Sequence, residues 1–433
     1  MILDNLQQLQ ELQQQVVNKE IILIPILEDE FAHLASNRII GYYIKILHTD
    51  KEYTVFIEHP EALYTVDIVP FLSTCKKVYC YNKQALIYNG LLVLPNMVDA
   101  FMQMYLYENS IPDIGVSRIA DFYRRKFPIK TSLITDAIKL QSRARFIAES
   151  ISIHNNTCER FYEEAFAKVF HTIERNGMKV DKQAFMQAFP DNTALIGEYA
   201  FSKYNFYTAT GRPSNRFGGV NFAALNKEDD TREAFISRYE NGILLELDFQ
   251  SYHPRILADI VQYTIDDGES IYEHLAKHYF NTTTPTTDEV SEAKELTFKQ
   301  LYGGISNKYK GIEYFSKIDN FTQILWDSFQ SNGHIQSLIS KRILHKQNIE
   351  DVNPTKLLNY FIQLHETEQN VIFLSSIFDR LDADIKPILY TYDSILFDVP
   401  GDKVDDLKQL IASCIPGRFP YRFKSGTNYK SLQ

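Results

Sequence analysis

Residues 242–260 read GILLELDFQSYHPRILADI and carry the clearest strand-to-helix pattern in the chain. The apolar start predicts a β-strand, and a helix is expected to begin near Tyr252, with Pro254 in its first turn. Asp248 ends the strand and precedes a polar turn. An exposed strand end suits a metal ligand, but a single Asp at such a position is more often a turn residue.

Residues 387–400 read PILYTYDSILFDVP and predict a β-hairpin. Tyr392, Asp393 and Ser394 lie at the bend between two apolar strands. A carboxylate at Asp393 costs free energy there unless it is solvated, paired or bound to a metal. Asp393 is therefore a second candidate ligand, and an ordinary turn residue is again the alternative.

A strong helix is predicted over residues 288–302, and the two glycines that follow it break the pattern. Lys294, Phe298 and Tyr302 recur every four residues, so they line one face. A lysine on the same stripe as two aromatic rings could hold a triphosphate at one end and stack against a base at the other. The alternative is an ordinary amphipathic helix.

Length, net charge and cysteine content limit the classes of protein to which the chain can belong. The 433 residues are more than one domain usually holds, so two domains are expected. The net charge of -10 argues weakly against a nucleic-acid partner, although a basic groove can coexist with an acidic total. The 4 cysteines are too few and scattered for a disulfide scaffold or a zinc site. The N-terminus lacks a signal peptide and no apolar run reaches membrane-span length, which predicts a cytoplasmic protein without membrane contact.

The N-terminal third is predicted to contain strands followed by helices. Residues 5–18 have the spacing of an amphipathic helix, and residues 21–56 contain three apolar, β-branched runs typical of strands. Helical patterns follow over residues 94–108 and 142–176. The N-terminal third therefore reads as a small sheet with helices packed on it.

Four segments in order form a more specific signal than any of them alone. They are TATGRPS at 208–214, LDFQSYHPRIL at 247–257, AKELTFKQLYGG at 293–304 and YTYDSILFDV at 390–399. Together they resemble the polymerase motifs of family A, the DNA polymerase I-like DNA polymerases, over roughly residues 155–433. The stretch TGRPSNRFGGVNFAALNK at 210–227 resembles polymerases of phages or mobile elements, which would imply a bacterial host cytoplasm.

The resemblance implies an α/β multidomain fold. An RNase H-like domain of the 3′–5′ exonuclease type is expected at residues 1–150 and a right-hand polymerase domain at 151–433. The expected subdomains are a palm at 155–260 and 355–433 and fingers at 261–354. Only a short segment precedes TATGRPS where the family inserts a thumb, so the thumb is expected to be short or absent. Weak processivity is then expected, compensated by a partner such as a processivity factor or other replication protein, by a short gap substrate, or by basic loops.

The resemblance also implies a set of metal and nucleotide contacts. Asp248 and Asp393, with the main-chain carbonyl of Phe249, would hold two Mg²⁺ ions, for which Mn²⁺ can substitute. Lys294 would contact the incoming phosphates. Phe298 would pack on the sugar and base.

The remaining implied contacts are to the template, the primer and the sugar. Tyr302 would lie near the templating base. Four residues would hold the primer end and its minor groove, and they are Arg212, Arg255, Asn359 and Gln363. His253 stands where the family's DNA polymerases usually have a Glu that helps to exclude a ribose 2′-hydroxyl, so sugar selectivity is left open.

Two further positions depart from the family pattern. Val290 replaces an Arg that contacts the triphosphate, so another cation must substitute or nucleotide affinity is lower. Ser394 follows the hairpin Asp where bacterial enzymes carry a Glu, which removes an auxiliary carboxylate. Because the two principal aspartates and Lys294 are retained, activity is still expected.

The first domain is expected to have lost proofreading. The family's exonuclease holds its metals with four carboxylates, and the matching positions here are Ile26, Glu28, Leu86 and Ser150, with Phe146 in place of a Tyr. One carboxylate cannot hold two magnesium ions. A structural or DNA-guiding role is expected for this degenerate domain.

The predicted function is template-directed, primer-dependent DNA synthesis from dNTPs on primer–template DNA, without proofreading. One alternative is primase-like or RNA-polymerase-like ribonucleotide synthesis by the same site, suggested by Ser394 and by His253. Another is an inactive nucleic-acid-binding subunit, suggested by Val290 and the acidic total charge. An unrelated α/β enzyme with coincidental motifs is the third.

Overall fold

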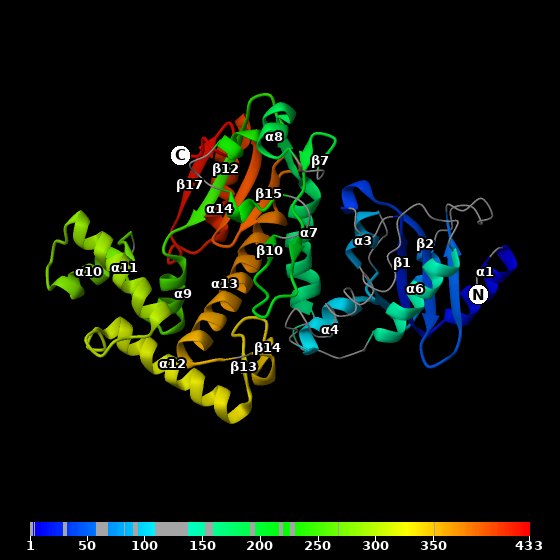
Figure 1. Cartoon of the computed structure of the whole chain (residues 1–433), viewed down its shortest axis with the longest axis horizontal. Helices are drawn as coiled ribbons and strands as arrows, with labels where there is room; N and C mark the ends of the chain where they lie inside the picture. The colour runs from blue at the N-terminus through cyan, green and yellow to red at the C-terminus, as the bar shows by residue number, and fades with distance from the viewer. Residues whose placement is uncertain are drawn as a thin grey trace. The chain divides into compact units, whose positions relative to one another are not determined.

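The computed structural model describes most of the chain (Figure 1). The described residues are 3, 5–28, 33–57, 68–81, 83–89, 94–108, 137–151, 158, 160–190, 195–215, 220–225, 230–266, 268–349 and 351–433. They divide into two compact units, Met1–Glu164 and Ala165–Gln433, and each is described by itself. Within the described residues, no helix is long and apolar enough to cross a bilayer.

The N-terminal unit is built on a five-stranded mixed sheet with the order β3-β2-β1-β4-β5. The strands are β1 Glu20–Leu27, β2 Ile39–Ile46, β3 Glu52–Phe56, β4 Lys77–Cys80 and β5 Met97–Asp99. β1 pairs antiparallel with β2 and parallel with β4, and β3 and β5 form the edges. The β-branched runs predicted to be strands are therefore confirmed as β1, β2 and β3.

Apolar side chains cover both faces of this sheet. Successive β1 residues point to opposite sides, so Ile21 and Leu23 join one buried cluster whereas Ile22 and Ile24 join another. The helices are α1 Leu6–Val16, α2 Val69–Leu72, α3 Lys83–Tyr88, α4 Ala100–Glu108 and α6 Ala137–Ser150, with a 3-10 turn at Leu34–Ser36. The predicted opening helix is confirmed as α1, which Asn5 caps by accepting a hydrogen bond from the Gln8 N–H.

Two predicted helical stretches differ from the structure. The stretch 94–108 begins with strand β5, and Asp99 then starts α4 because its side chain accepts hydrogen bonds from the N–H groups of Phe101 and Met102. The stretch 142–176 is not one helix. It contains the end of α6, a π-helical turn at Phe161–Phe166 and α7 at Ala167–Asn176.

The C-terminal unit contains a four-stranded antiparallel sheet with the order β15-β16-β12-β17. Its strands are β12 Gly242–Phe249, β15 Lys386–Thr391, β16 Ser394–Pro400 and β17 Tyr421–Gly426. Both the predicted strand before Asp248 and the predicted hairpin are confirmed. A second sheet has the order β11-β6-β8-β7, from Phe235–Ile236, Met178–Val180, Tyr199–Ala200 and Leu195–Ile196.

Helices surround these sheets and extend beyond them (Figure 1). They are α7 Ala167–Asn176, α8 Lys182–Ala188, α9 Tyr252–Ile260, α10 Ile271–Phe280, α11 Thr287–Gly303, α12 Glu313–Asn332, α13 Pro354–Phe378 and α14 Val404–Cys414. Short strands pair as β9 Tyr204–Asn205 with β10 Ser214–Asn215, and as β13 His334–Gln336 with β14 Ile343–His345. Single 3-10 turns lie at Phe222–Ala224, Asp230–Ala234, Lys346–Asn348 and Gly401–Lys403.

Helix α13 joins the main sheet to the lobe formed by α10, α11 and α12. It runs from the region of α12 toward the sheet that holds β12 and β15 (Figure 1). Its apolar residues pack on both α11 and α12, through Leu358 and Ile362 in one cluster and Phe361 and Leu364 in another. Helix α11 begins and ends within one residue of the predicted bounds. A capping box between Thr286 and Glu289 starts it.

Candidate functional site

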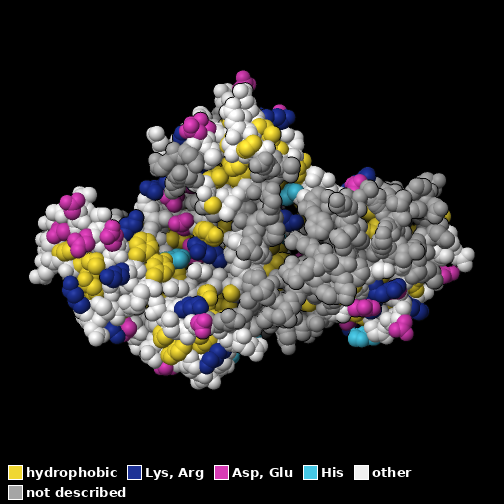
Figure 2. All heavy atoms as spheres, in the orientation of Figure 1, with side chains coloured by type: hydrophobic (Ala, Val, Ile, Leu, Met, Phe, Trp, Pro, Cys, Tyr) yellow, Lys and Arg dark blue, Asp and Glu magenta, His cyan; other side chains and the backbone are white. Residues whose placement is uncertain are grey.

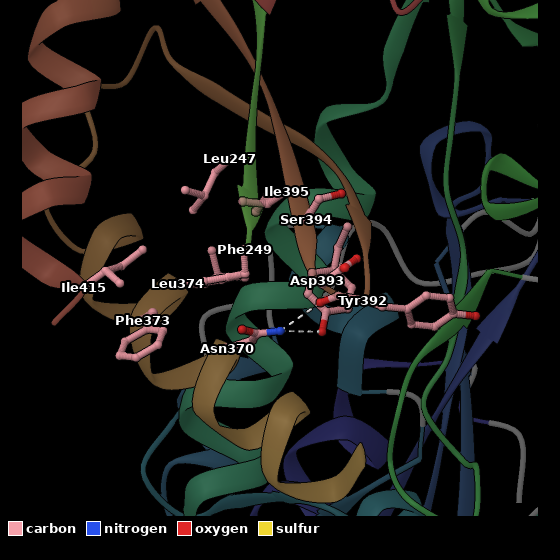
Figure 3. A pocket seen from close by; sticks show the side chains of 11 residues that line it. Leu247, Phe249, Asn370, Phe373, Leu374, Tyr392, Asp393, Ser394, Ile395 and Ile415 are labelled. Carbon is pink, nitrogen blue, oxygen red and sulfur yellow. Dashed lines mark hydrogen bonds between the residues drawn. The ribbon is translucent and has the colours of Figure 1, made fainter. Parts of the chain in front are cut away.

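The strand register brings the two candidate aspartates together. In the antiparallel pair of β12 and β16, Asp248 is opposite Ser394, and the Phe249 N–H donates to the main-chain oxygen of Asp393 at 3.0 Å. Asp393 occupies the bend of the hairpin beside this pair (Figure 3). Two residues far apart in sequence therefore lie side by side at one end of the sheet.

Asn370 of α13 fixes the bend that carries Asp393. Tyr392 has a φ of 61°, a left-handed conformation that a tyrosine adopts only when its surroundings hold it there. The Asn370 amide donates to the Tyr392 carbonyl at 2.8 Å and to the Tyr390 hydroxyl at 3.0 Å (Figure 3). Its oxygen accepts from the Tyr252 hydroxyl at 2.7 Å, which ties the start of α9 to the same point.

The two aspartates have opposite electrostatic surroundings. Two cations of β17 approach the carboxylate of Asp248, with Arg422 Nε at 2.9 Å and Lys424 Nζ at 2.7 Å. Desolvation, and then the negative charges of Glu366 and Asp248, raise the pKa of Asp393. Desolvation is the main cause of this shift, and the two negative neighbours add to it.

One face of α13 supplies polar groups to this end of the sheet. Asn359, Gln363, Glu366 and Asn370 follow one another at intervals of four, three and four residues, so they share a helix face. Gln363 accepts a hydrogen bond of 3.4 Å from the Thr210 hydroxyl in the TATGRPS loop. Glu366 is 1% exposed.

Arg212 and His253 meet at Glu366. Arg212 Nε lies 3.1 Å from one carboxylate oxygen of Glu366, and His253 Nε2 lies 3.1 Å from the other. The Arg212 guanidinium also lies 3.8 Å from the ring centre of Tyr392, next to Asp393. Two residues that the sequence assigned to separate contacts thus share one buried carboxylate.

The aromatic stripe of α11 reaches the same group. The rings of Phe298 and Tyr302 stack nearly parallel, 5.7 Å apart at an angle of 11°, and both are partly exposed. The Tyr302 hydroxyl lies 2.5 Å from Nδ1 of His253. Lys294 is exposed on the same stripe, whereas Val290 packs against the apolar cluster of α10 and α12. On the face drawn in Figure 2, hydrophobic and basic side chains lie together where α9 and α11 approach α13.

Two of the predicted primer-contacting residues have buried polar groups. Arg255 is buried and donates to the main-chain oxygen of Glu269, so the structure does not bring it to the aspartates. Asn359 lies on the shared face of α13, and its side-chain oxygen is buried with no hydrogen-bond partner within the part of the chain that the structure describes. Arg212 and Gln363 are brought together through the TATGRPS loop.

Four residues of the site were missed in the sequence. Glu366 and Asn370 could have been found by extending the helical stripe of Asn359 and Gln363 by two further turns. Arg422 and Lys424 alternate with aromatic residues in YRFKSG, which is the pattern of a strand with one charged face. Their contact with Asp248 depends on the pairing of β12 with β17, which neither segment reveals by itself.

The donor set fits an oxygen-ligated divalent cation in part. Across the described ranges, no group of three or more His, Cys, Asp or Glu side chains is arranged to hold a metal ion. Mg²⁺ is usually held by only one or two carboxylates, together with waters and substrate phosphates. Asp248 and Asp393 match that pattern in number and in kind of donor. Phe249, the third predicted ligand, is fixed between them by its N–H bond to Asp393.

Among the described positions matched to exonuclease ligands, Glu28 is the single carboxylate. Ile26 and Leu86 are buried in apolar clusters, at 4% and 1% exposure. Glu28 forms a surface ion pair with Arg38, with 2.7 Å between the carboxylate and Nε. The side chain of Ser150 lies outside the described residues.

Comparison with known proteins shows the fold. No model of a protein family matches the sequence, and no curated protein matches it either. Among solved structures, the chain is similar to the POL domain of Pol1 from M. smegmatis, in a complex with DNA primer-template and dNTP. The TM-score is 0.72 at 12% sequence identity, over 100% of this chain and 99% of that chain. The chain therefore has the mixed α/β fold of a DNA polymerase's polymerase domain.

Proposed function

We propose that this chain is a template-directed, primer-dependent DNA polymerase that transfers nucleotides from dNTPs to a primer end. The observation that carries the proposal is the convergence of Asp248 and Asp393 with the aromatic stripe of α11, through the contact of His253 with Tyr302. A carboxylate pair, and a helix face that carries two stacked rings and an exposed lysine, suit a triphosphate with an attached base. The likeness to a polymerase domain solved with primer-template and dNTP supports the same reading.

In this proposal each element has one task. The sheet of β12 and β16 is the palm. Asp248 and Asp393 would hold two Mg²⁺ ions, which would activate the primer hydroxyl and neutralise charge at the phosphates. Helix α11 belongs to the fingers, where Lys294 contacts the phosphates and Phe298 packs on the sugar and base. Tyr302 then faces the templating base.

The primer end is proposed to lie along α13. Arg212 and Gln363 are held together through the TATGRPS loop, and Asn359 lies one turn before Gln363 on the same face. Amide and guanidinium groups are the donors that contact base edges and sugars in a minor groove. Arg255 is buried and donates to the main chain of Glu269, so it is proposed to brace α9 against the segment before α10.

Primer extension on a templated duplex with magnesium tests the proposal. Asp248→Asn and Asp393→Asn should each abolish deoxynucleotide incorporation, because each removes a carboxylate on which charge neutralisation depends. Asp327→Asn is the matched control, since Asp327 is exposed on α12 and its carboxylate accepts a hydrogen bond from the Gln323 amide, one turn away on the same helix. Incorporation that survives both aspartate changes would refute the proposal.

The same experiment separates the ribonucleotide alternative. His253 occupies the position beside Tyr302 where the sugar would lie, and an imidazole there is bulky enough to restrict a 2′-hydroxyl. We propose that deoxynucleotides are preferred. Synthesis from ribonucleotides alone, above all without a primer, would instead establish a primase-like enzyme.

We also propose that the N-terminal unit does not proofread. The proposal rests on Ile26 and Leu86, which are buried apolar residues, and on Glu28, whose charge is engaged by Arg38. Hydrogen bonding to Arg38 lowers the pKa of Glu28, as expected for a carboxylate in an ion pair. A duplex with a mismatched primer end should persist unshortened in the presence of magnesium and the wild-type chain. Removal of the mismatched nucleotide would contradict this.

Weak grip on duplex DNA is a further part of the proposal. The thumb is expected between β6 and β10. The described residues there form one helix, α8, and short strands. With a trap that captures released enzyme, products from one encounter should be short. Products of many hundreds of nucleotides from a single encounter would contradict a reduced thumb.

A further inference from the structure

We infer that Glu366 is a positioning residue that holds Arg212 and His253 together, so that one buried carboxylate sets both the discrimination between sugars and the grip on the primer end. The inference rests on the proposed function and assigns a role to a residue that the sequence motifs leave out. It follows from the burial of Glu366, from its two partners and from the contacts that those partners make in turn.

The first step is the cost of burying Glu366. Its side chain is 1% exposed, and an isolated carboxylate is expensive to remove from water. An apolar residue at this point of α13 would avoid that cost, so the carboxylate is explained by what it holds. Its two oxygens face different partners, Arg212 on one side and His253 on the other, each at 3.1 Å.

The second step is the orientation of His253. Both of its ring nitrogens face a partner: Nε2 lies 3.1 Å from Glu366, and Nδ1 lies 2.5 Å from the Tyr302 hydroxyl. Burial raises the pKa of Tyr302 to about 12, so this hydroxyl keeps its proton at neutral pH. Contacts at both ends fix the ring plane, and a fixed ring excludes a 2′-hydroxyl better than one free to rotate.

The third step is the connection to the hairpin. Arg212 lies between Glu366 and the ring of Tyr392, whose neighbour is Asp393. Arg212 Nε, His253 Nε2 and one oxygen of Glu366 are buried at ion-pair distances, but their angles do not make hydrogen bonds. Buried polar groups are normally hydrogen-bonded. We therefore expect a primer end or nucleotide bound beside Arg212 to shift these groups into better alignment.

The test compares Glu366→Ala with Glu366→Gln and with Glu368→Gln. Glu368 is a matched control, because it is equally buried on α13 but bonds to Ser337 and Ser340, away from Arg212 and His253. The measured quantities are the kcat/KM ratio of dNTP to rNTP incorporation and the Kd for primer–template. Unfolding is monitored separately through Trp326.

Glu366→Ala should lower the sugar discrimination by about tenfold and weaken primer–template binding by a similar factor, as expected when a charge-assisted contact is lost. Glu366→Gln retains the shape and should recover part of both. Combined with His253→Ala, Glu366→Ala should cause no further loss of discrimination, because it acts through that ring. Glu368→Gln should lower stability and leave the discrimination ratio unchanged.

Three results would overturn the inference, and each has a different meaning. Synthesis with unchanged discrimination and primer binding in Glu366→Ala would show that the carboxylate positions nothing, while the proposed function would stand. Equal losses of discrimination in Glu366→Ala and Glu368→Gln would show that the effect is general destabilisation of α13. Absence of any synthesis by the wild-type chain would overturn the proposed function, and this inference with it.

Discussion

Replacing Asn370 with alanine is expected to loosen the hairpin that carries Asp393. Asn370 is 2% exposed and makes hydrogen bonds of 2.7, 2.8 and 3.0 Å to Tyr252, to the Tyr392 carbonyl and to Tyr390. Each such bond contributes about 1 kcal/mol net, and each buried partner left without one costs about 1–3 kcal/mol. Allowing for relaxation, the C-terminal unit should lose about 3–5 kcal/mol of unfolding free energy.

Activity should fall further than stability alone would explain. The left-handed backbone of Tyr392 is held by the bond from Asn370, so its release lets Asp393 move away from Asp248. A displacement of about 1 Å at a reacting centre can lower a rate about 100-fold. We therefore expect kcat for primer extension to drop by about that factor, under conditions where the variant remains folded.

Two assays check this prediction. The chain has 1 tryptophan, Trp326, which lies on α12 against the cluster that includes Phe361 and Leu364 of α13, so its fluorescence reports urea unfolding of the C-terminal unit. Primer extension below the unfolding range gives kcat. Gln369→Ala, at the neighbouring half-buried position, is the control and should change stability by less than about 1 kcal/mol. An Asn370→Ala chain with the wild-type urea midpoint and rate would refute the reasoning.

Three further predictions concern stability. In the N-terminal unit, Lys83→Met should cost about 3 kcal/mol in thermal or urea unfolding, because Lys83 Nζ lies 2.9 Å from the buried carboxylate of Glu163. Burial raises the pKa of Glu163 to about 7 from 4.5, against the opposing charge of Lys83. The folded state then binds the Glu163 proton more tightly than the unfolded state does. The contribution of Glu163 to the unfolding free energy should be full below pH 4.5 and decline as the pH rises to 7. An unchanged slope of unfolding free energy against pH in Glu163→Gln would contradict this. Gly242→Ala should destabilise the start of β12 by about 1–3 kcal/mol in urea unfolding, because an added Cβ would lie 2.0 Å from Ser237 Oγ. An unchanged urea midpoint would show that the Ser237 side chain rotates away.

The elements of the site could be predicted because their signals are local. The strand before Asp248, the hairpin around Asp393 and helix α11 each have a hydrophobic period and a terminus that a short window of sequence contains. The helix predicted over 94–108 was wrong in its first residues for a related reason. Met97–Asp99 is apolar enough to fit either period, and only its pairing with β4 makes it a strand.

The partners of the site could not be predicted because they depend on register. Arg422 and Asp248 are separated by most of the C-terminal unit, and they meet only because Asp248 is opposite Arg422 in the pairing of β12 with β17. A slip of one residue would turn both basic side chains of β17 to the other face. Glu366 is different, since its place on the helix face of Gln363 was visible. What the sequence could not show was that Arg212 and His253 both face it.

The charges around the two aspartates explain why they should not be treated as an equivalent pair. Two cations lie within 2.9 Å of the Asp248 carboxylate, whereas desolvation and then the negative charges of Glu366 and Asp248 raise the pKa of Asp393. Replacing Asp248 by Asn leaves Arg422 and Lys424 without that counter-charge, and replacing Asp393 by Asn relieves repulsion. The two aspartates differ because the strand register places β17 beside Asp248. Helix α13 lies instead beside the bend that carries Asp393.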